Sequence, residues 1–136
     1  MVDLVITAAN VMSGADARIE NGFAGVVVTA GQVVYLDPAD NRYKLADTDS
    51  AVVAARNPRG IALNGAAAGQ PLAVQRSGDI AIGGTLVSAT AYYLSGNPGG
   101  ICPAADLAPG DFTAVLGVSK STSVLALWIN APGVSL

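Results

Sequence analysis

The chain has 136 residues, of which 25 are alanine and 16 are glycine, and its seven basic and ten acidic residues give a net charge of −3. It has no histidine, which excludes Ser-His-Asp and Cys-His nucleophilic sites and most catalytic zinc sites. The basic residues are scattered rather than clustered, so the sequence predicts no direct binding of nucleic acid. High apolar content and low charge predict one ordered domain over residues 1–136.

Turn signals rich in Gly, Pro and Asn recur along the chain and separate short segments rich in Val, Ile, Leu, Thr and Tyr. This spacing predicts an all-β fold: a single-domain β-sandwich, jelly-roll-like, with at most one short helix. Residues 1–22 are interpreted as an extended N-terminal arm and loop: an apolar start is followed by a polar stretch in which Asp16, Arg18 and Glu20 alternate with Ala17 and Ile19, typical of an extended edge segment or a mobile loop. The predicted strands are Leu4–Thr7, Gly25–Val28, Val33–Asp37, Tyr43–Leu45, Gly60–Leu63, Leu72–Arg76, Ile80–Ile82, Ala91–Ser95, Thr113–Ser119 and Ser123–Ile129.

Two local patterns predict shorter features. Thr48 or Asp49 is a candidate N-cap for a helix over Ser50–Arg56, which Pro58 would stop. The sequence Ala-Gly-Gln occurs at 30–32 and again at 68–70, each time before an apolar run, which predicts two equivalent turns that enter two strands. Turn spacing leaves the order of the strands in the sheet open.

The apolar run 124–129 predicts a strand that is covered on both faces or lies at a subunit contact. Trp128 lies inside this run, so we expect a core position for it, with a subunit contact as the alternative. Gln75 and Arg76 end another apolar run, so we expect that strand to leave the core there. Because alanine and glycine bury little apolar area, the core is expected to be thin, and association into a homo-oligomer would add burial.

The sequence offers little reactive chemistry. Asp37 and Asp40 do not match the spacing of a calcium loop and are typical of polar turns. The single Cys102 has no basic neighbour in sequence and is interpreted as a small buried residue. Phosphate-binding glycine motifs are absent. We therefore expect no enzymatic activity, no cofactor and no metal site.

The stretch Ile80–Ala105 lacks charge for 26 residues, which makes it the one candidate for a membrane span. Five glycines and two prolines interrupt it and leave only short apolar runs. Because a spanning helix would not tolerate so many breakers, the sequence predicts no association with a membrane.

The order of several segments carries a resemblance. These segments are Gly25–Asp37, Tyr43–Asp47, Arg59–Asn64, Ala68–Val74, Gly83–Leu86, Tyr92–Ser95 and Pro98–Ile101. Taken in order, they resemble a family of tailed-bacteriophage capsid cement proteins, also called head decoration proteins, over about Phe23 to Ile129. The resemblance implies a compact, non-enzymatic β domain on the outer surface of a phage head, made in the bacterial host cytoplasm. It also implies that the domain bridges neighbouring subunits of the major capsid protein and forms a homo-oligomer, a dimer or a trimer.

The residues that would contact such partners are hypotheses. One candidate is an N-terminal arm whose apolar residues Val2, Leu4 and Ile6 add to a neighbouring sheet or lie on the shell. Arg56 and Arg59 flank a turn and either anchor a carboxylate of a partner or are solvated charges. The alternative function is a phage β-sandwich module that binds a host-surface glycan or receptor, which exposed aromatic residues around a polar cleft would favour.

Overall fold

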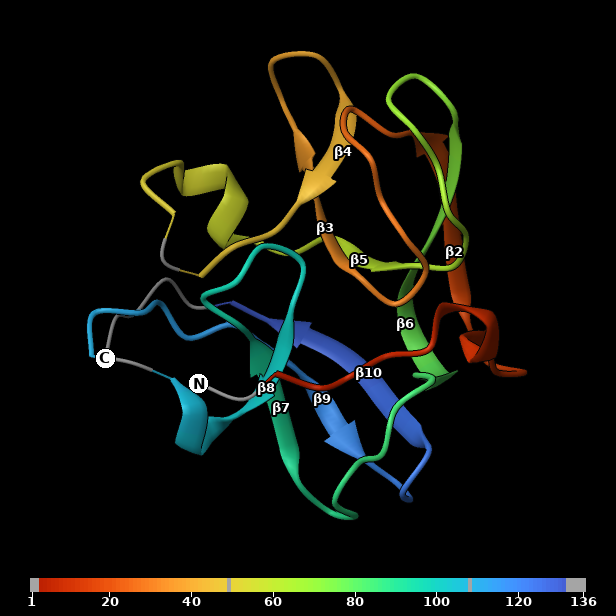
Figure 1. Cartoon of the computed structure of the whole chain (residues 1–136), viewed down its shortest axis with the longest axis vertical. Coiled ribbons are helices and arrows are strands. Elements are labelled where there is room, and N and C mark those ends of the chain that lie inside the picture. The colour runs from red at the N-terminus through yellow and green to blue at the C-terminus, as the bar shows by residue number, and fades with distance from the viewer. Residues whose placement is uncertain (1–2, 49, 108, 132–136) are drawn as a thin grey trace.

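A computed structural model describes residues 3–48, 50–107 and 109–131 (Figure 1). Within these ranges, the strands form one antiparallel sheet in the order β4-β3-β5-β6-β10-β9-β7-β8, and β1 and β2 pair with β6 beside this path. The predicted all-β, single-domain fold is confirmed, and the sheet curls over its own core. The strands are β1 Met12–Ser13, β2 Arg18–Phe23, β3 Val33–Asp37, β4 Arg42–Leu45, β5 Gly60–Ala62, β6 Pro71–Ala81, β7 Ala91–Leu94, β8 Ile101–Pro103, β9 Val115–Ser119 and β10 Val124–Asn130.

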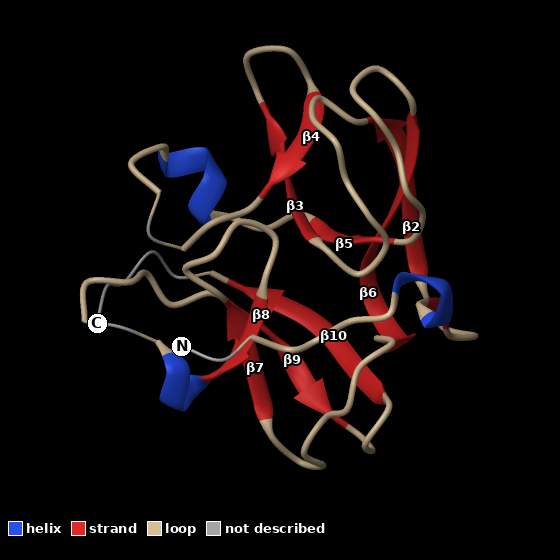
Figure 2. Cartoon of the chain, in the orientation of Figure 1, coloured by secondary structure: helices blue, strands red, loops and turns tan. Residues whose placement is uncertain are grey.

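Helical structure in the described ranges is limited to short 3-10 helices at Ala8–Asn10, Val53–Arg56 and Ala104–Asp106 (Figure 2). The helix predicted over Ser50–Arg56 is therefore a single turn that begins at Val53. The Thr48 hydroxyl donates to the carbonyl oxygen of Phe112 and does not act as its cap. The segment is too short to hold an α-helix without tertiary support.

The long strand β6 organises the sheet. One of its edges pairs with β2 and β1, and the other pairs with β5 and β10. A register shift opposite the Arg18–Ile19 step of β2 marks a β-bulge near the middle of β6. The strand was expected to leave the core at Gln75 and Arg76, and it does so one residue late: Arg76 is exposed, but Gln75 is fully buried and its Nε2 donates to the carbonyl oxygens of Ser77 and Asp79.

The core has two parts, and β6, which runs between the upper and lower halves of Figure 1, contributes side chains to both. In the upper half, Ala24 bridges to Tyr43 of β4 and so closes β2, β6, β5, β3 and β4 around a small cluster that includes Val34, Leu72 and Val74. In the lower half, β6, β10, β9, β7 and β8 cover a larger cluster whose fully buried members include Ile61, Ile80, Ile82, Leu94, Ile101, Leu116 and Leu125.

The segment Asp3–Thr7, which we call the N-terminal strap, crosses the lower half. The Leu4 N–H donates to the Ile101 carbonyl at 2.8 Å, and the Thr7 N–H donates to the Gly83 carbonyl at 2.8 Å. Leu4 and Ile6 pack against the larger cluster, whereas Val5 between them is 86% exposed. The predicted strand Leu4–Thr7 is thus an extended segment that covers this protein's own core.

The two predicted equivalent turns are confirmed. Gln32 Oε1 accepts a hydrogen bond from the Thr29 N–H at 2.9 Å, and Gln70 Oε1 accepts one from the Ala67 N–H at 2.8 Å. The glycine before each glutamine has a positive φ, +92° at Gly31 and +85° at Gly69. Each turn leads directly into a strand, β3 or β6.

The surroundings of the two glycines differ, and this difference predicts unequal effects of substitution. An added Cβ at Gly31 would lie 2.5 Å from Ile6 Cγ2 of the strap, whereas at Gly69 the nearest atom would be 3.9 Å away. Gly69→Ala should lower the free energy of unfolding by about 1–2 kcal/mol through the left-handed backbone alone. Gly31→Ala should lower it by a further ~1–3 kcal/mol through overpacking, as measured by urea denaturation. An equal decrease in the free energy of unfolding in both variants would contradict the packing of the N-terminal strap on the turn that contains Gly31.

Candidate functional site

The most exposed large hydrophobic side chain on the described strands is Trp128, which is 80% exposed. The expectation that it lies in the core is wrong, because β10 alternates: Leu125 and Leu127 are buried, and Trp128 points outward. A register shift between Leu127 and Asn130 places a β-bulge at this point of β10. Bulges commonly re-aim side chains at functional positions.

On one side of Trp128 lies a shallow hollow, which we call the apolar depression. Its volume is about 590 Å³, and it is lined on β9 and β10 by Val115, Gly117, Val118 and Ala126. Its border is polar: Asp16, Asp79 and Asn130 also line it, and Lys120 Nζ binds Asp79 Oδ2 at 2.8 Å. An apolar floor beside a standing indole ring can accept an apolar group of a partner.

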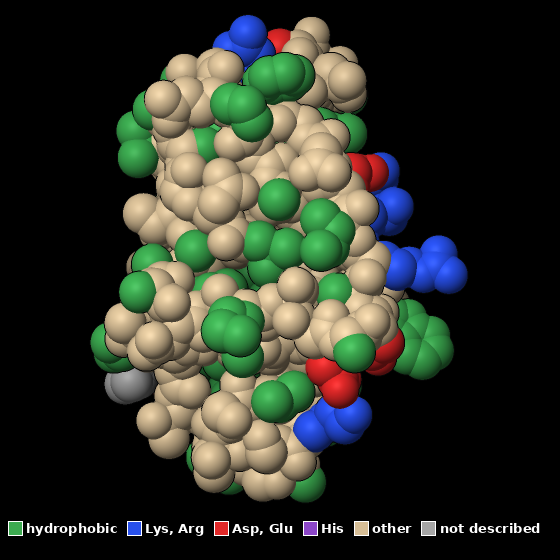
Figure 3. Space-filling view, turned by 90° about the vertical axis from the view of Figure 1, so that its right-hand side faces the viewer, with side chains coloured by type: hydrophobic (Ala, Val, Ile, Leu, Met, Phe, Trp, Pro, Cys, Tyr) green, Lys and Arg blue, Asp and Glu red, His purple; other side chains and the backbone are tan. Residues whose placement is uncertain are grey.

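On the other side of Trp128 lies a second open hollow of about 1130 Å³, which we call the arginine groove. Arg18, Arg59, Arg76 and Glu20 line it, together with apolar side chains of Ile19, Pro58 and Ile129. Figure 3 shows Lys and Arg side chains and a protruding hydrophobic group along the right-hand edge of the molecule. Aromatic, apolar and cationic groups therefore share one surface, which we call the Trp128 surface and define as the depression, the groove and Trp128 between them.

Glu20 is held by two partners at the wall of the groove. Arg59 Nε donates to Glu20 Oε2 at 3.0 Å and Arg59 Nη2 donates to Oε1 at 2.7 Å, while the Tyr43 hydroxyl also donates to Oε2. The hydrogen bonds from Arg59 lower the pKa of Glu20 to about 2, with a smaller contribution from Tyr43 and against the opposing effect of burial. Burial, followed by the neighbouring Glu20, raises the pKa of Tyr43.

This pKa shift predicts how stability depends on pH. Because the folded pKa of Glu20 lies near 2 and its ordinary value is 4.5, ionised Glu20 stabilises the fold above pH 4.5, and this stabilisation is lost as the pH falls from 4.5 through 2. Glu20→Gln should therefore unfold more easily at pH 7, and the difference from the unsubstituted protein should shrink as the pH falls toward 2. Urea denaturation at pH 7, 4.5 and 3 measures this, and a constant difference would contradict the assignment.

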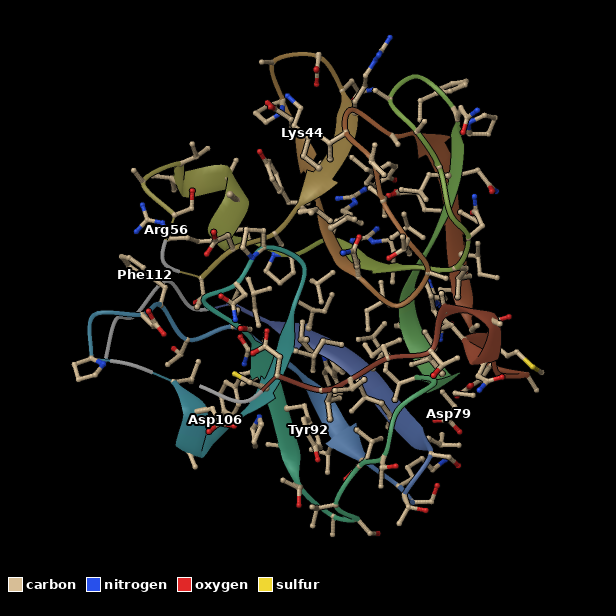
Figure 4. All side chains as sticks on the ribbon, in the orientation of Figure 1. Lys44, Arg56, Asp79, Tyr92, Asp106 and Phe112 are labelled. Carbon is tan, nitrogen blue, oxygen red and sulfur yellow. The ribbon has the colours of Figure 1, made fainter. Side chains whose placement is uncertain are left out.

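The sequence-predicted interface residues lie at separate places. Val2 lies outside the described residues, and Leu4 and Ile6 pack on the larger core cluster. Arg59 lies in the arginine groove, paired with Glu20. Arg56 instead places its guanidinium 3.8 Å from the centre of the Phe112 ring, on the opposite side of the molecule from Asp79 (Figure 4). The role of these residues at an interface stays a prediction.

The groups that sequence reasoning weighed as reactive have structural partners. Lys44 Nζ binds Asp37 Oδ2 at 2.7 Å and Asp40 Oδ2 at 3.3 Å beside the turn between β3 and β4. Burial raises the pKa of the Cys102 thiol to about 12, so the group stays protonated at neutral pH. Among the described residues, no three His, Cys, Asp or Glu side chains gather as metal ligands. That part of the chain also lacks any helix long and apolar enough to cross a membrane.

Sequence reasoning missed the Trp128 surface although a signal for it was present. In the run 124–129, the two leucines occupy alternate positions, so one face of the strand carries them and the other carries Val124, Ala126 and Trp128. The run was interpreted as apolar on both faces because all six side chains are apolar.

Comparison with known proteins gives no relative: no family model matches the chain, and no curated protein matches it significantly. The geometry therefore stands beside the sequence resemblance as the basis for a functional proposal. What it offers is a rigid sheet that presents an indole ring, an apolar hollow and guanidinium groups on one surface.

Proposed function

We propose that this protein is a structural protein of a tailed-bacteriophage virion, which binds the outer surface of the capsid and cements neighbouring subunits of the major capsid protein. The ordered resemblance to capsid cement proteins supports the class of function. The observation that carries the proposal is the 80% exposure of Trp128 above an apolar depression. An exposed tryptophan on the outer face of a sheet is the kind of side chain that dominates the free energy of protein–protein binding.

The way in which the surface is built supports a binding role. Trp128 and the lining of the depression lie on β9 and β10, whose inward side chains Leu116, Leu125 and Leu127 are buried in the larger cluster. The surface is therefore pre-organised, so little conformational entropy would be lost on binding. A shell carries many copies of its subunits, so contacts of modest affinity add up through multivalency.

The division of the core into two clusters supports a further part of this proposal, which is that the protein forms a homo-oligomer, a dimer or a trimer. Each cluster consists mainly of aliphatic side chains and alanines. Burial of more apolar area between copies would add stability. Sedimentation equilibrium gives the oligomeric state directly, and a monomer at all concentrations would contradict this part of the proposal.

The test of the main proposal is co-sedimentation of the purified protein with heads of its phage from which this protein has been omitted. We expect saturable binding with a fixed number of copies per capsid subunit, and an increase in the temperature at which the heads release their DNA. Heads that neither bind the protein nor gain stability would contradict the proposal.

A second candidate is a module that binds a host-surface glycan or receptor. The observation that favours it is the position of Trp128 beside the polar arginine groove, because sugar rings stack on exposed aromatic side chains while their hydroxyls bind charged groups. A glycan-array screen tests it in parallel with the heads. Binding to glycans together with no binding to heads would reverse the order of the two candidates.

A further inference from the structure

We infer that the partner at the Trp128 surface is an extended acidic segment of the capsid subunit, whose carboxylates bind Arg18 and Arg76 while a nearby apolar side chain enters the apolar depression. This inference rests on the proposed function for the identity of the partner. It goes beyond that function by stating the chemistry that the surface selects.

The first step is the charge of the arginine groove. Its charged lining consists of three arginines and one glutamate, in a chain whose net charge is −3. Glu20 and Arg59 neutralise each other through two hydrogen bonds. Within residues 3–48, 50–107 and 109–131, Arg18 and Arg76 form no salt bridge, and both are exposed. The charged lining of the groove, three arginines and one glutamate, therefore has a net charge of +2 on an acidic protein.

The second step is the placement of these charges relative to Trp128. Ser77 of β6 pairs with Arg18 of β2 on one side and with Trp128 of β10 on the other, so the three residues lie in one row across three strands. Neighbouring strands are about 4.8 Å apart, which puts Arg18 and Trp128 roughly 10 Å apart along the row. An extended peptide rises ~3.3 Å per residue and places every second side chain on the same face, so a carboxylate and an apolar side chain four positions apart, ~13 Å, both face the surface and reach from Arg18 past Trp128 into the apolar depression.

The third step is the choice between partners. A nucleic-acid strand that followed the surface past Trp128 would leave the arginines and meet the apolar floor of the depression, which offers a phosphate backbone no favourable contact. An acidic segment with one apolar side chain has a favourable contact on each side of the indole. Guanidinium groups bind carboxylates in a bidentate manner, which gives such a segment a fixed register.

The test uses the chain's only tryptophan as a reporter, because Trp128 fluorescence responds to occupancy of either hollow. The probes are three peptides of equal length: an acidic one that contains leucine, its lysine-for-aspartate counterpart, and an acidic one in which glycine replaces leucine. We expect the acidic peptide that contains leucine to bind most tightly.

The double variant Arg18→Gln/Arg76→Gln should bind this peptide at least about tenfold more weakly than the unsubstituted protein, as expected for the loss of charge-assisted hydrogen bonds. Arg42→Gln, an exposed arginine on β4, is the matched control and should bind normally.

The unsubstituted protein, the double variant and Arg42→Gln are then each sedimented with heads that lack this protein. Loss of head binding in the double variant but not in Arg42→Gln, with affinity that falls as salt rises, supports the inference. Equal head binding by all three proteins overturns the inference and leaves the proposed function standing. If no form binds heads, the proposed function fails, and the peptide titration decides the inference about chemistry on its own. Preference for the lysine peptide, or self-association that the double variant abolishes, overturns it in favour of a basic partner or a second copy of this chain.

Discussion

A variant that lacks Met1–Thr7 is expected to lose about 2–5 kcal/mol of its free energy of unfolding, which is a large part of the stability of an ordinary domain. The strap contributes two apolar side chains to the larger core cluster and two hydrogen bonds, from Leu4 to Ile101 and from Thr7 to Gly83. Asp3 adds a further tie, because it accepts hydrogen bonds from the Ser95 hydroxyl at 2.6 Å and from Asn97 Nδ2 at 3.1 Å. Its removal would expose the apolar surface that Leu4 and Ile6 cover.

Point substitutions separate the packing of the strap from its backbone contacts. Leu4→Ala/Ile6→Ala should reproduce most of the loss in urea denaturation, since both side chains pack on the core. Val5→Ala is the matched control: its side chain is 86% exposed, so stability should change by less than about 0.5 kcal/mol. A truncated protein as stable as the full chain would contradict the structural role of the strap and would leave the segment free for the role in a neighbouring sheet that the sequence suggested.

Trp128→Ala is expected to weaken binding to phage heads by about thirtyfold or more, which corresponds to the ~2 kcal/mol of an interface hot spot. Because the indole is 80% exposed, the free energy of unfolding should stay within about 0.5 kcal/mol of the original. Quantitative co-sedimentation measures the first effect and urea denaturation measures the second.

The control for Trp128 is Phe23, the other strongly exposed aromatic side chain among the described residues, which is 54% exposed at the end of β2. Phe23→Ala should leave head binding unchanged, since Phe23 lines neither the apolar depression nor the arginine groove. Loss of binding in Phe23→Ala together with normal binding in Trp128→Ala would move the contact surface to another part of the molecule.

Most strands could be predicted because the patterns that mark them, short apolar segments between turn residues, can be read from neighbouring residues in the sequence. The predicted Val33–Asp37 coincides with β3, and the predictions for β4, β5 and β7 differ from the structure by a residue at one end. Strand β6 was predicted as two strands because Ser77-Gly78 has the composition of a turn. In the structure these residues lie within a continuous strand, next to the bulge that the pairing with β2 imposes. A bulge depends on the pairing with the partner strand, and that pairing cannot be predicted from the residues around Ser77 and Gly78 alone.

Strand β2 could not be predicted from the hydrophobic pattern of its own residues. Its sequence Arg-Ile-Glu-Asn-Gly-Phe is mostly polar, and it was interpreted as part of an extended arm or loop. It pairs with β6 over the length of the strand, from Arg18 opposite Ser77 to Phe23 opposite Pro71. Pairing of the backbone over this range needs no apolar side chain, and so the hydrophobic pattern carried no sign of it.

The candidate site was predictable only in fragments. Arg59 was expected to anchor a carboxylate of a partner or to be a solvated charge, and the structure pairs it instead with Glu20 of the same chain, 39 positions away. Arg18, Arg76 and Trp128 come together through the register of β2, β6 and β10. Single-residue reasoning assigned Trp128 to the core because it weighed the apolar run as a whole and not its two faces.

Hydroxyl-radical footprinting of the decorated head tests the central claim, contact through the Trp128 surface, most directly. Mass spectrometry compares the oxidation of Trp128 and Phe23 in the free protein and in the protein bound to heads. We predict that Trp128 is oxidised readily in the free protein and strongly protected on the head, while the oxidation of Phe23 stays the same. Equal oxidation of Trp128 in the free and bound protein would contradict the claim.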